Sequence, residues 1–435
     1  MLTLHSGISI TGLNINNDSL ITFAELTQTI KVTVGKNGFL SIADSNGNII
    51  SGYSIQLSSA SQKQFIEGTV FSIQQSSNQY DNNRDQVIVC FLADSLIKTP
   101  NGNKSVEKII LGDKVITYAD GVEVTRPITW VGKSTCHVRP HLPEDEAGYP
   151  VRILKGAIAE NVPFKDLLIT AEHCLFFEGK FVPARLLVNG RSIFYDHSFT
   201  SYDYYHIETE EHSVVMADGM LTESYLDTGN RRSFRQQGDV VSIGHSRQMT
   251  WNKDSAAPLE VSRTFVEPLF RVLEKRANKV GYDIQSEPRP LTYESDLHLV
   301  TGSGTVIRST RRQNGWVVFM IPERIETIYL VSNASRPCDV IGPFVDDRRY
   351  FGVAVGDITL FTAERAFAID THLTDADLDG WNSLENDSTR WTTGNARLPI
   401  SHSAHSGPAL LSIRITQEGP YITTEISPEN HALKA

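Results

Sequence analysis

Short alternating runs of apolar and polar residues dominate this chain, and this pattern predicts a mainly β protein. The clearest runs are residues 30–34, 70–73, 114–118, 175–177, 316–321, 327–331 and 352–355. Pairs that favour tight hairpin turns separate many of them, among them Asn101-Gly102, Asp120-Gly121 and Glu178-Gly179. We therefore expect many short strands joined by tight turns.

One stretch has helical spacing instead. Its apolar residues recur on one helical face, at Val266, Leu269, Phe270, Leu273, Ala277 and Val280. Pro268 is tolerable in the first turn, and Gly281 is suited to end the helix in a left-handed conformation. The pattern predicts one amphipathic helix, over about 266–280, that bridges two domains.

These patterns divide the 435 residues into four parts. Residues 1–89 are a β-rich passenger module that ends in a polar linker at 74–86. Residues 90–230 are a compact all-β domain, and 231–287 are a linker that holds the helix. The strand signals of 288–435 are spaced as in a β-sandwich.

Composition narrows the classes of partner. The net charge of -11 disfavours nucleic acid and anionic membranes. The four widely spaced cysteines form no C-x-x-C pair, so we expect free thiols. No apolar run reaches transmembrane length, and the N-terminus has no signal-peptide pattern.

Three separated segments carry candidate chemistry. Cys90 follows the polar linker and opens the all-β domain; Thr170-Ala171-Glu172-His173 comes later; and His206 and His212 lie further on. Taken singly, a cysteine is more often a small buried apolar residue and a histidine a structural one. Together, a thiol and histidines elsewhere in the chain are what nucleophilic catalysis needs.

The order and spacing of these segments resemble the Hedgehog/intein (Hint) family. Cys90 with the following FLADSLIKTPNG is similar to the first block of that family, TAEH at 170–173 to its T-x-x-H block, and the stretch from Tyr204 to Asn230 to its third block. The closest resemblance is to bacterial Hint domains that carry a C-terminal extension. It implies an all-β horseshoe domain flanked by the N-terminal module and the C-terminal sandwich.

The resemblance also implies a reaction. The Cys90 thiol would attack the carbonyl carbon of Val89 and replace the amide by a thioester. His173 would protonate the departing nitrogen of Cys90, and Thr170 would hold that amide. His212 and His206 are both candidates for a second acid or base, and the sequence does not decide between them. No cofactor is required, and the protein would be an enzyme only in the single-turnover sense.

Two departures limit the reaction. Inteins usually end in His-Asn, whereas the corresponding stretch is Thr222-Glu223-Ser224-Tyr225, so true splicing is not expected. Hedgehog proteins carry an aspartate that activates a sterol as the nucleophile. The comparable residues here, 121–130, include no aspartate, so sterol transfer is not expected. The expected outcome is cleavage of the thioester by water or by an external thiol or amine, and the β-branched Val89 predicts that it is slow.

Two groups of residues are candidates for binding a metal ion, one for calcium and one for zinc. Asp375, Asp377 and Asp379 have the spacing of a calcium loop, but the twelfth position is Asn386, and an acidic turn has the same pattern. Zinc could bind among Cys136, His137, Cys174 and the candidate histidines, although no structural zinc spacing is present, and there it would inhibit.

A binding protein is the rival function. In that interpretation the Hint fold is inactive or regulatory, and the outer β-modules contact a glycan or a cell-surface partner. Trp381 and Trp391 in the C-terminal part are candidates for sugar contacts, although tryptophans are more often buried. A conventional cysteine hydrolase is disfavoured by the sequence around Cys90. The resemblance implies a secreted or surface location, but localisation stays open.

Overall fold

The computed structural model spans residues 1–435 and is described here for residues 90–228, 249–385, 388–400 and 407–423, together with the strands of the first 85 residues and strand β21 (Arg235–Gln236). The chain divides into two compact units, Met1–Asp85 and Gln86–Ala435. The predicted boundary at residue 89 lies close to this division. Val89 and the linker at 74–86 lie outside the described residues.

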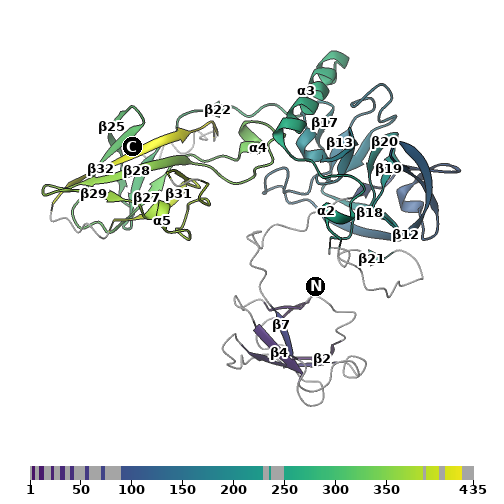
Figure 1. Ribbon diagram of the computed structural model, residues 1–435, viewed down its shortest axis with the longest axis horizontal. Helices are drawn as coiled ribbons and strands as arrows, with labels where there is room; N and C mark the ends of the chain where they lie inside the picture. The colour runs from purple at the N-terminus through teal and green to yellow at the C-terminus, as the bar shows by residue number, and fades with distance from the viewer. Residues whose placement is uncertain are drawn as a thin grey trace. The chain divides into compact units, whose positions relative to one another are not determined.

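The first unit consists of short strands (Figure 1). They are β1 (Leu2–Leu4), β2 (Ser9–Leu13), β3 (Ile21–Phe23), β4 (Ile30–Val34), β5 (Leu40–Ala43), β6 (Ser54–Leu57) and β7 (Val70–Ile73). Strand β4 pairs antiparallel with β5 and β7, while β1 pairs parallel with β3 and β2 with β6. The strands predicted at 30–34 and 70–73 are confirmed.

The second unit begins with one large sheet. Its strands are β8 (Phe91–Leu92), β9 (Leu96–Thr99), β10 (Gly102–Ser105), β11 (Lys114–Ala119), β12 (Val122–His137), β13 (Val151–Ile153), β14 (Leu167–Ile169), β15 (Cys174–Phe177), β16 (Lys180–Pro183), β17 (Ile193–Tyr195), β18 (Ser201–Thr209), β19 (Val214–Ala217) and β20 (Met220–Glu223). The main path runs β16-β15-β20-β19-β11-β12-β18-β8-β14-β13-β17. Short 3₁₀ turns, η2 (Val106–Lys108) and η3 (Ala184–Leu187), interrupt it.

The predicted hairpin turns are present. Asp120 and Gly121 join β11 to β12 with φ of 50° and 78°, and Glu178 and Gly179 join β15 to β16 with φ of 47° and 80°. Two successive positive φ values match the right-handed twist of paired strands, and glycine adopts the second without strain. The turns predicted at these two pairs are therefore confirmed.

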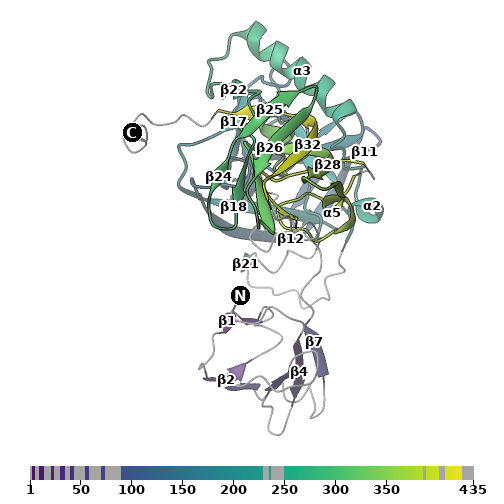
Figure 2. The same cartoon turned by 90° about the vertical axis from the view of Figure 1, so that its left-hand side faces the viewer.

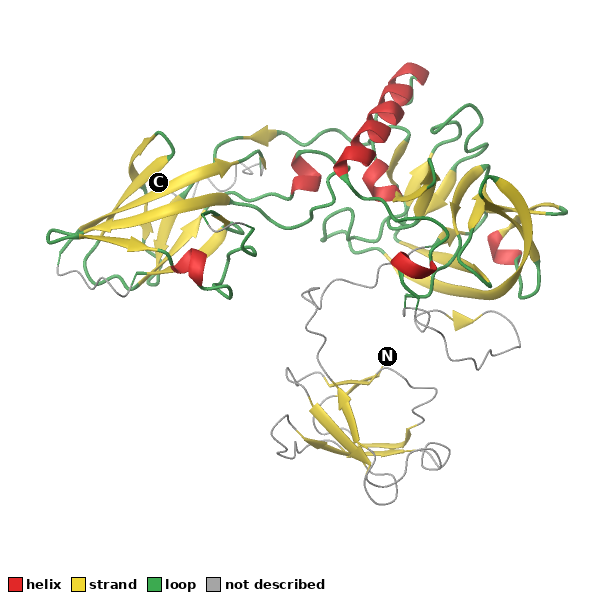
Figure 3. Ribbon diagram, in the orientation of Figure 1, coloured by secondary structure: helices red, strands yellow, loops and turns green. Residues whose placement is uncertain are grey.

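The only long helix of the described residues is α3 (Arg263–Val280), which begins three residues before the predicted start (Figure 3). Pro268 therefore lies inside the helix and not in its first turn. Gly281 ends it as predicted, with φ of 86° and its N–H bonded to the carbonyl of Ala277. Among the described residues, no helix is long and apolar enough to span a membrane.

The buried face of α3 differs from the prediction at its C-terminal end. Val266, Phe270, Leu273 and Ala277 are buried as expected, but Val280 is 53% exposed. The first three of these join the same apolar core as Phe91, Ile97 and Ile169 of the large sheet. The helix thus completes the core of the sheet that carries Cys90, and its Phe270 also contacts Phe344 of the C-terminal part, with ring centroids 5.1 Å apart.

The C-terminal part has two sheets around one core (Figure 2). Its strands are β22 (Leu291–Thr292), β23 (His298–Thr301), β24 (Val306–Ile307), β25 (Ser309–Gln313), β26 (Trp316–Ile321), β27 (Thr327–Val331), β28 (Val353–Phe361), β29 (Ala366–Ile369), β30 (Arg390–Trp391), β31 (Asn395–Pro399), β32 (Ala409–Glu418) and β33 (Tyr421–Ile422). One sheet is β24-β23-β27-β31 and the other is β25-β26-β32-β28-β29, with β30 on β28. Both predicted strands 316–321 and 327–331 are confirmed, and β28 extends the third to residue 361.

Three single-turn helices were not predicted. They are α2 (Trp251–Asp254), α4 (Pro337–Val340) and α5 (Thr371–Thr374). Each is four residues long, which is too short for a periodic apolar pattern to reveal it. The chain is nevertheless mainly β, as predicted.

A buried carboxyl group lies at the turn between β19 and β20. Asp218 is fully buried with φ of 49°, and its Oδ1 accepts from the N–H of Leu96 at 3.2 Å. The Nζ of Lys165 is 3.7 Å away. Burial raises the pKa of Asp218 to about 6, and Lys165 opposes that rise. The folded chain therefore holds this proton more tightly than the unfolded chain.

We expect Asp218→Asn to stabilise the protein at neutral pH. A carboxyl group with a raised pKa stabilises the folded chain fully below its ordinary pKa, where it is protonated in both states. This contribution is lost as the pH rises through about 6, and the free energy of unfolding then falls by about 3 kcal/mol. Asparagine keeps the acceptor oxygen and tolerates positive φ. Calorimetry should show a higher Tm for Asp218→Asn at pH 7.5 and little difference at pH 4.

Asp113→Asn is the matched control. Hydrogen bonds from Lys104 and the N–H of Ile110 outweigh partial burial and lower the pKa of Asp113. Its stabilising contribution is present above the ordinary pKa and lost as pH falls, so Asp113→Asn should lower the Tm at pH 7.5. A lower Tm for Asp218→Asn at pH 7.5 would contradict the inference that the buried carboxylate of Asp218 destabilises the fold.

Candidate functional site

Cys90 directly precedes β8, in the interior of the large sheet. Strand β8 is bordered by β18 and β14. Cys90 has no exposed surface and belongs to an apolar cluster with Leu92, Cys136, Tyr202 and Tyr204. The thiol is thus excluded from bulk water, whereas ordinary reactive cysteines are accessible to solvent.

Thr170 holds the backbone of Cys90 at both of its polar groups. The N–H of Cys90 donates to Oγ1 of Thr170 at 2.8 Å. The N–H of Thr170 donates in turn to the carbonyl of Cys90 at 3.0 Å. Thr170 directly follows β14, whose Ile169 pairs with Phe91, so strand pairing places this hydroxyl. The amide nitrogen of the Val89-Cys90 bond is therefore fixed from the Cys90 side.

His173 lies beside Thr170 and is held by contacts on three sides. Its N–H donates to the carbonyl of Thr170 at 3.1 Å, and its ring stacks on Phe91 with centroids 4.4 Å apart. Its Nε2 is 2.5 Å from Oγ1 of Thr222. The Thr222 hydroxyl donates its own proton to the carbonyl of Cys174 at 2.7 Å. Nε2 of His173 must therefore carry the hydrogen of that contact.

This arrangement leaves Nδ1 of His173 with a bare lone pair. Nδ1 is buried and has no hydrogen-bond partner among the described residues. Burial lowers the pKa of His173 to about 4, with the charge of Glu223 opposing and His212 adding to that shift. The imidazole is consequently neutral at physiological pH, and Nδ1 is ready to accept a proton.

Glu223 places a buried carboxylate next to this group. Its Oε1 accepts from the N–H of Cys174 at 2.6 Å, and its Oε2 is 3.6 Å from Nε2 of His212. Burial, then the charges of Glu223 and Cys136, raise the pKa of the Cys90 thiol. The side chain of Cys90 is thus a protonated thiol at rest, and it would have to lose this proton to act as a nucleophile.

The two candidate histidines differ in how they are engaged. His212 accepts from the N–H of Ala256 at 3.1 Å through Nδ1, and its Nε2 is 3.0 Å from the carbonyl of Ser224. Both ring nitrogens are therefore occupied by backbone groups. His206 directly follows Tyr205, which pairs with Phe91 of β8, and burial and His173 lower the pKa of His206.

Comparison with known proteins identifies this part of the chain. Residues 89–229 match the sequence profile of the Hint domain family. Residues 89–229 are a Hint domain. The match begins one residue before Cys90 and covers Thr170, His173 and both further histidines.

Solved structures with intein names match about a third of the chain. A bacterial intein-like domain from Clostridium thermocellum is 16% identical, covers 32% of this chain and 99% of its own length, and has a TM-score of 0.23. A DnaB intein from Synechocystis sp. PCC 6803 is 14% identical over 31% of this chain and 98% of its own, with a TM-score of 0.22. No curated protein matches the chain.

A segment from outside the Hint sequence supports the T-x-x-H loop. Glu172 forms ion pairs with Arg185 at 2.9 Å and with Arg348 at 3.0 Å. Arg185 also contacts Asp346 at 2.9 Å, and Phe344 joins the core of the Hint domain. Ion pairs with residues between β27 and β28 thus stabilise the loop that carries Thr170 and His173.

The metal sites predicted from the sequence find no geometric support. Among the residues that the structure describes, no group of three or more His, Cys, Asp or Glu side chains is placed to hold a metal ion. The side chains of Asp375, Asp377 and Asp379 are exposed. The carbonyl of Asp375 accepts a hydrogen bond from the buried guanidinium of Arg390 at 2.6 Å. Calcium and zinc binding stay predictions.

Four cysteines are free, as predicted, and two functional residues were missed. Cys90, Cys136, Cys174 and Cys338 form no disulfide. In the sequence, Thr222 and Glu223 mark only the absence of a His-Asn ending, but in the structure Thr222 contacts His173 and Glu223 bonds the N–H of Cys174. The signal in the sequence is the polar run Thr222-Glu223-Ser224 directly after Met220-Leu221, and its burial is visible only in the structure.

Proposed function

We propose that this protein cleaves its own Val89-Cys90 peptide bond by an N-to-S acyl shift. The observation that carries the proposal is the 2.8 Å hydrogen bond from the amide N–H of Cys90 to the hydroxyl of Thr170, next to a neutral His173 whose Nδ1 is unpaired among the described residues. The nitrogen that must leave is already held, and a proton carrier lies beside it.

The acyl shift balances without a cofactor. The Cys90 sulfur forms a bond to the Val89 carbonyl carbon, the bond from that carbon to the Cys90 nitrogen breaks, and the thiol proton ends on the new amine. Neutral His173 can accept the thiol proton at Nδ1 and deliver it to the nitrogen. Glu223 favours the transient imidazolium, because its charge raises the pKa of His173.

Slow cleavage follows from the same environment. The raised pKa of the Cys90 thiol makes thiolate scarce at neutral pH. The low pKa of His173 makes it a weak base, and the β-branched Val89 crowds its own carbonyl. A stable intact precursor is therefore compatible with the proposal, and an added thiol should pull the reaction forward by trapping the thioester.

The thioester is resolved by water or by an external thiol or amine. Splicing is not proposed, because Thr222 and Glu223 occupy the stretch where inteins end in His-Asn, and Asn230 follows Gly229 and not a histidine. His206 is the better candidate for a second acid or base. It directly follows Tyr205, whose strand partner Phe91 is the residue after Cys90, and burial and the nearby His173 lower its pKa.

The test is the intact mass of freshly purified protein with and without dithiothreitol. We expect a thiol-accelerated break into residues 1–89 and a fragment whose N-terminal residue is Cys90. Sequencing of that fragment fixes the bond. A chain that stays intact under every condition would overturn self-cleavage and favour the rival, in which the Hint domain is an inactive scaffold of a binding protein.

Thr170→Val is expected to slow thiol-induced cleavage by about tenfold to a hundredfold. Valine keeps the shape of the side chain but cannot bond the departing amide, and a lost hydrogen bond in a buried site costs about 1–3 kcal/mol. The rate is followed by intact mass over time. Thr117→Val is the control, since this buried threonine bonds the carbonyl of Val124 elsewhere in the sheet. Equal rates for both variants would contradict a role for Thr170.

A further inference from the structure

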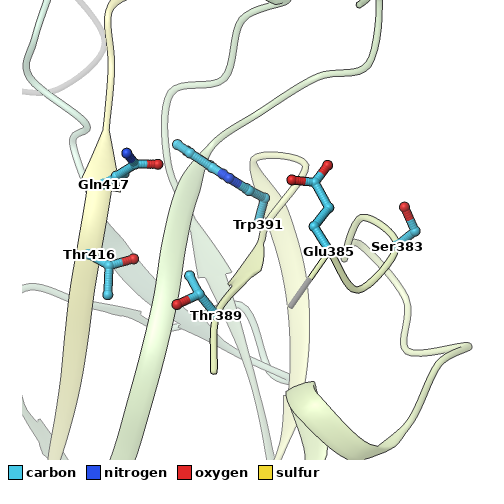
Figure 4. Close-up of a pocket in the computed structure, with 6 residues that line it drawn as sticks. All are labelled: Ser383, Glu385, Thr389, Trp391, Thr416 and Gln417. Atoms are coloured by element: carbon cyan, nitrogen blue, oxygen red, sulfur yellow. The ribbon is translucent and has the colours of Figure 1, made fainter. Parts of the chain in front are cut away.

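A polar pocket with one aromatic wall opens on the C-terminal sandwich. Its volume is about 340 Å³, and it is lined by Ser383, Glu385, Thr389, Trp391, Thr416 and Gln417 (Figure 4). This volume is at the small end of the range of about 300–1,000 Å³ for small-molecule sites, which suits one or two sugar rings.

Strand pairing explains why these residues meet. Trp391 of β30 pairs with Ala354 of β28, and Ala354 pairs with Gln417 of β32. Three neighbouring strands therefore bring the indole and the carboxamide to the same row of the sheet. Arg390, one residue before Trp391, is buried and bonds backbone carbonyls in the interior. The alternation of the strand thus sends Trp391 to the outer face.

The two main recognition groups are held before any ligand arrives. The half-buried ring of Trp391 packs in a T-shaped arrangement on Phe351, with centroids 5.3 Å apart. The guanidinium of Arg349 lies 4.9 Å from the same Phe351 ring and bonds Oε1 of Glu385 at 2.9 Å. The indole of Trp391 and the carboxylate of Glu385 are therefore both held by the neighbouring pair of Phe351 and Arg349. Such preorganisation lowers the entropy lost on binding.

The lining chemistry selects a neutral, hydroxyl-rich ligand. An indole face offers an apolar surface for the C–H face of a sugar ring, while carboxylate, carboxamide and hydroxyl groups can bond its hydroxyls. None of the six lining residues is cationic, and the one carboxylate is already paired with Arg349, so an anion is disfavoured. We propose that this pocket is a binding site for a neutral saccharide.

The structure separates this tryptophan from the other candidate in the same region. Trp381 is buried, and its Nε1 donates to the carbonyl of Arg397 at 2.7 Å, so it is a core residue. Trp391 alone of the two lines the pocket. The saccharide site does not depend on self-cleavage, because none of its residues belongs to the Hint domain.

The test is calorimetric titration of the full-length protein with neutral oligosaccharides: cellohexaose, xylohexaose, laminarihexaose, maltohexaose and chitohexaose. We expect at least one to bind with a Kd of about 1 mM or tighter. Trp391→Ala should weaken that binding by at least about tenfold, since a stacked tryptophan is commonly a dominant contact. Gln417→Ala, at an exposed position of β32, should weaken it as well and tests the pocket if Trp391→Ala does not fold.

Phe361→Ala is the matched control. Phe361 is 47% exposed at the far end of β28 from Ala354, so its loss removes an exposed aromatic ring away from the pocket. It should leave the affinity unchanged. Binding of none of the five sugars, or equal affinities for Phe361→Ala and for the folded pocket variants, would overturn the proposal.

Discussion

Replacing Cys90 by alanine is expected to abolish thiol-induced cleavage, with a rate at least about a thousandfold below that of the unchanged chain. Alanine keeps the small apolar volume of a fully buried position but removes the sulfur that must attack Val89. Intact mass after incubation with dithiothreitol measures the effect.

Cys136→Ala is the control for this variant. Cys136 is a second buried free thiol in the same apolar cluster, and its substitution removes a comparable volume. It should cleave at a rate close to that of the unchanged chain. Because Cys136 raises the pKa of Cys90, its removal does not disfavour the thiolate. Cleavage that persists in Cys90→Ala, or that is lost equally in Cys136→Ala, would sink the proposed nucleophile.

Replacing His173 by glutamine should slow cleavage by about a hundredfold to ten-thousandfold, the usual contribution of a positioned acid or base. Glutamine preserves a polar side chain near Thr222 but cannot carry a proton between sulfur and nitrogen. Since the pKa of His173 is about 4, protonation of this residue should not limit the rate of the unchanged chain until the pH falls close to that value. A rate series from pH 5 to pH 9 tests this point.

His212→Gln separates a catalytic role from a structural one. His212 is equally buried, but its ring nitrogens serve Ala256 and Ser224. We expect this variant to lose thermal stability and to keep its cleavage rate within about tenfold. If His212→Gln cleaves as slowly as His173→Gln while both remain folded, the assignment of the proton carrier to His173 is wrong.

Much of the architecture could be predicted because its signals are local. The strands at 30–34, 316–321 and 327–331 follow from alternation over a few residues, and Asp120-Gly121 marks its hairpin through its own backbone preference. Gly281 ends α3 for the same reason. Cys90, Thr170 and His173 could be named because their types and order are visible along the chain.

The sequence by itself determined a mainly β chain, its turns and the candidate nucleophile and histidine. Only the tertiary structure decided that Thr222 sets the tautomer of His173, that α3 packs into the Hint core, and that Trp391 and not Trp381 faces a pocket. The reason is physical. Thr222 is 49 residues from His173, and such a contact depends on how β20 and β15 pair, which no short pattern encodes.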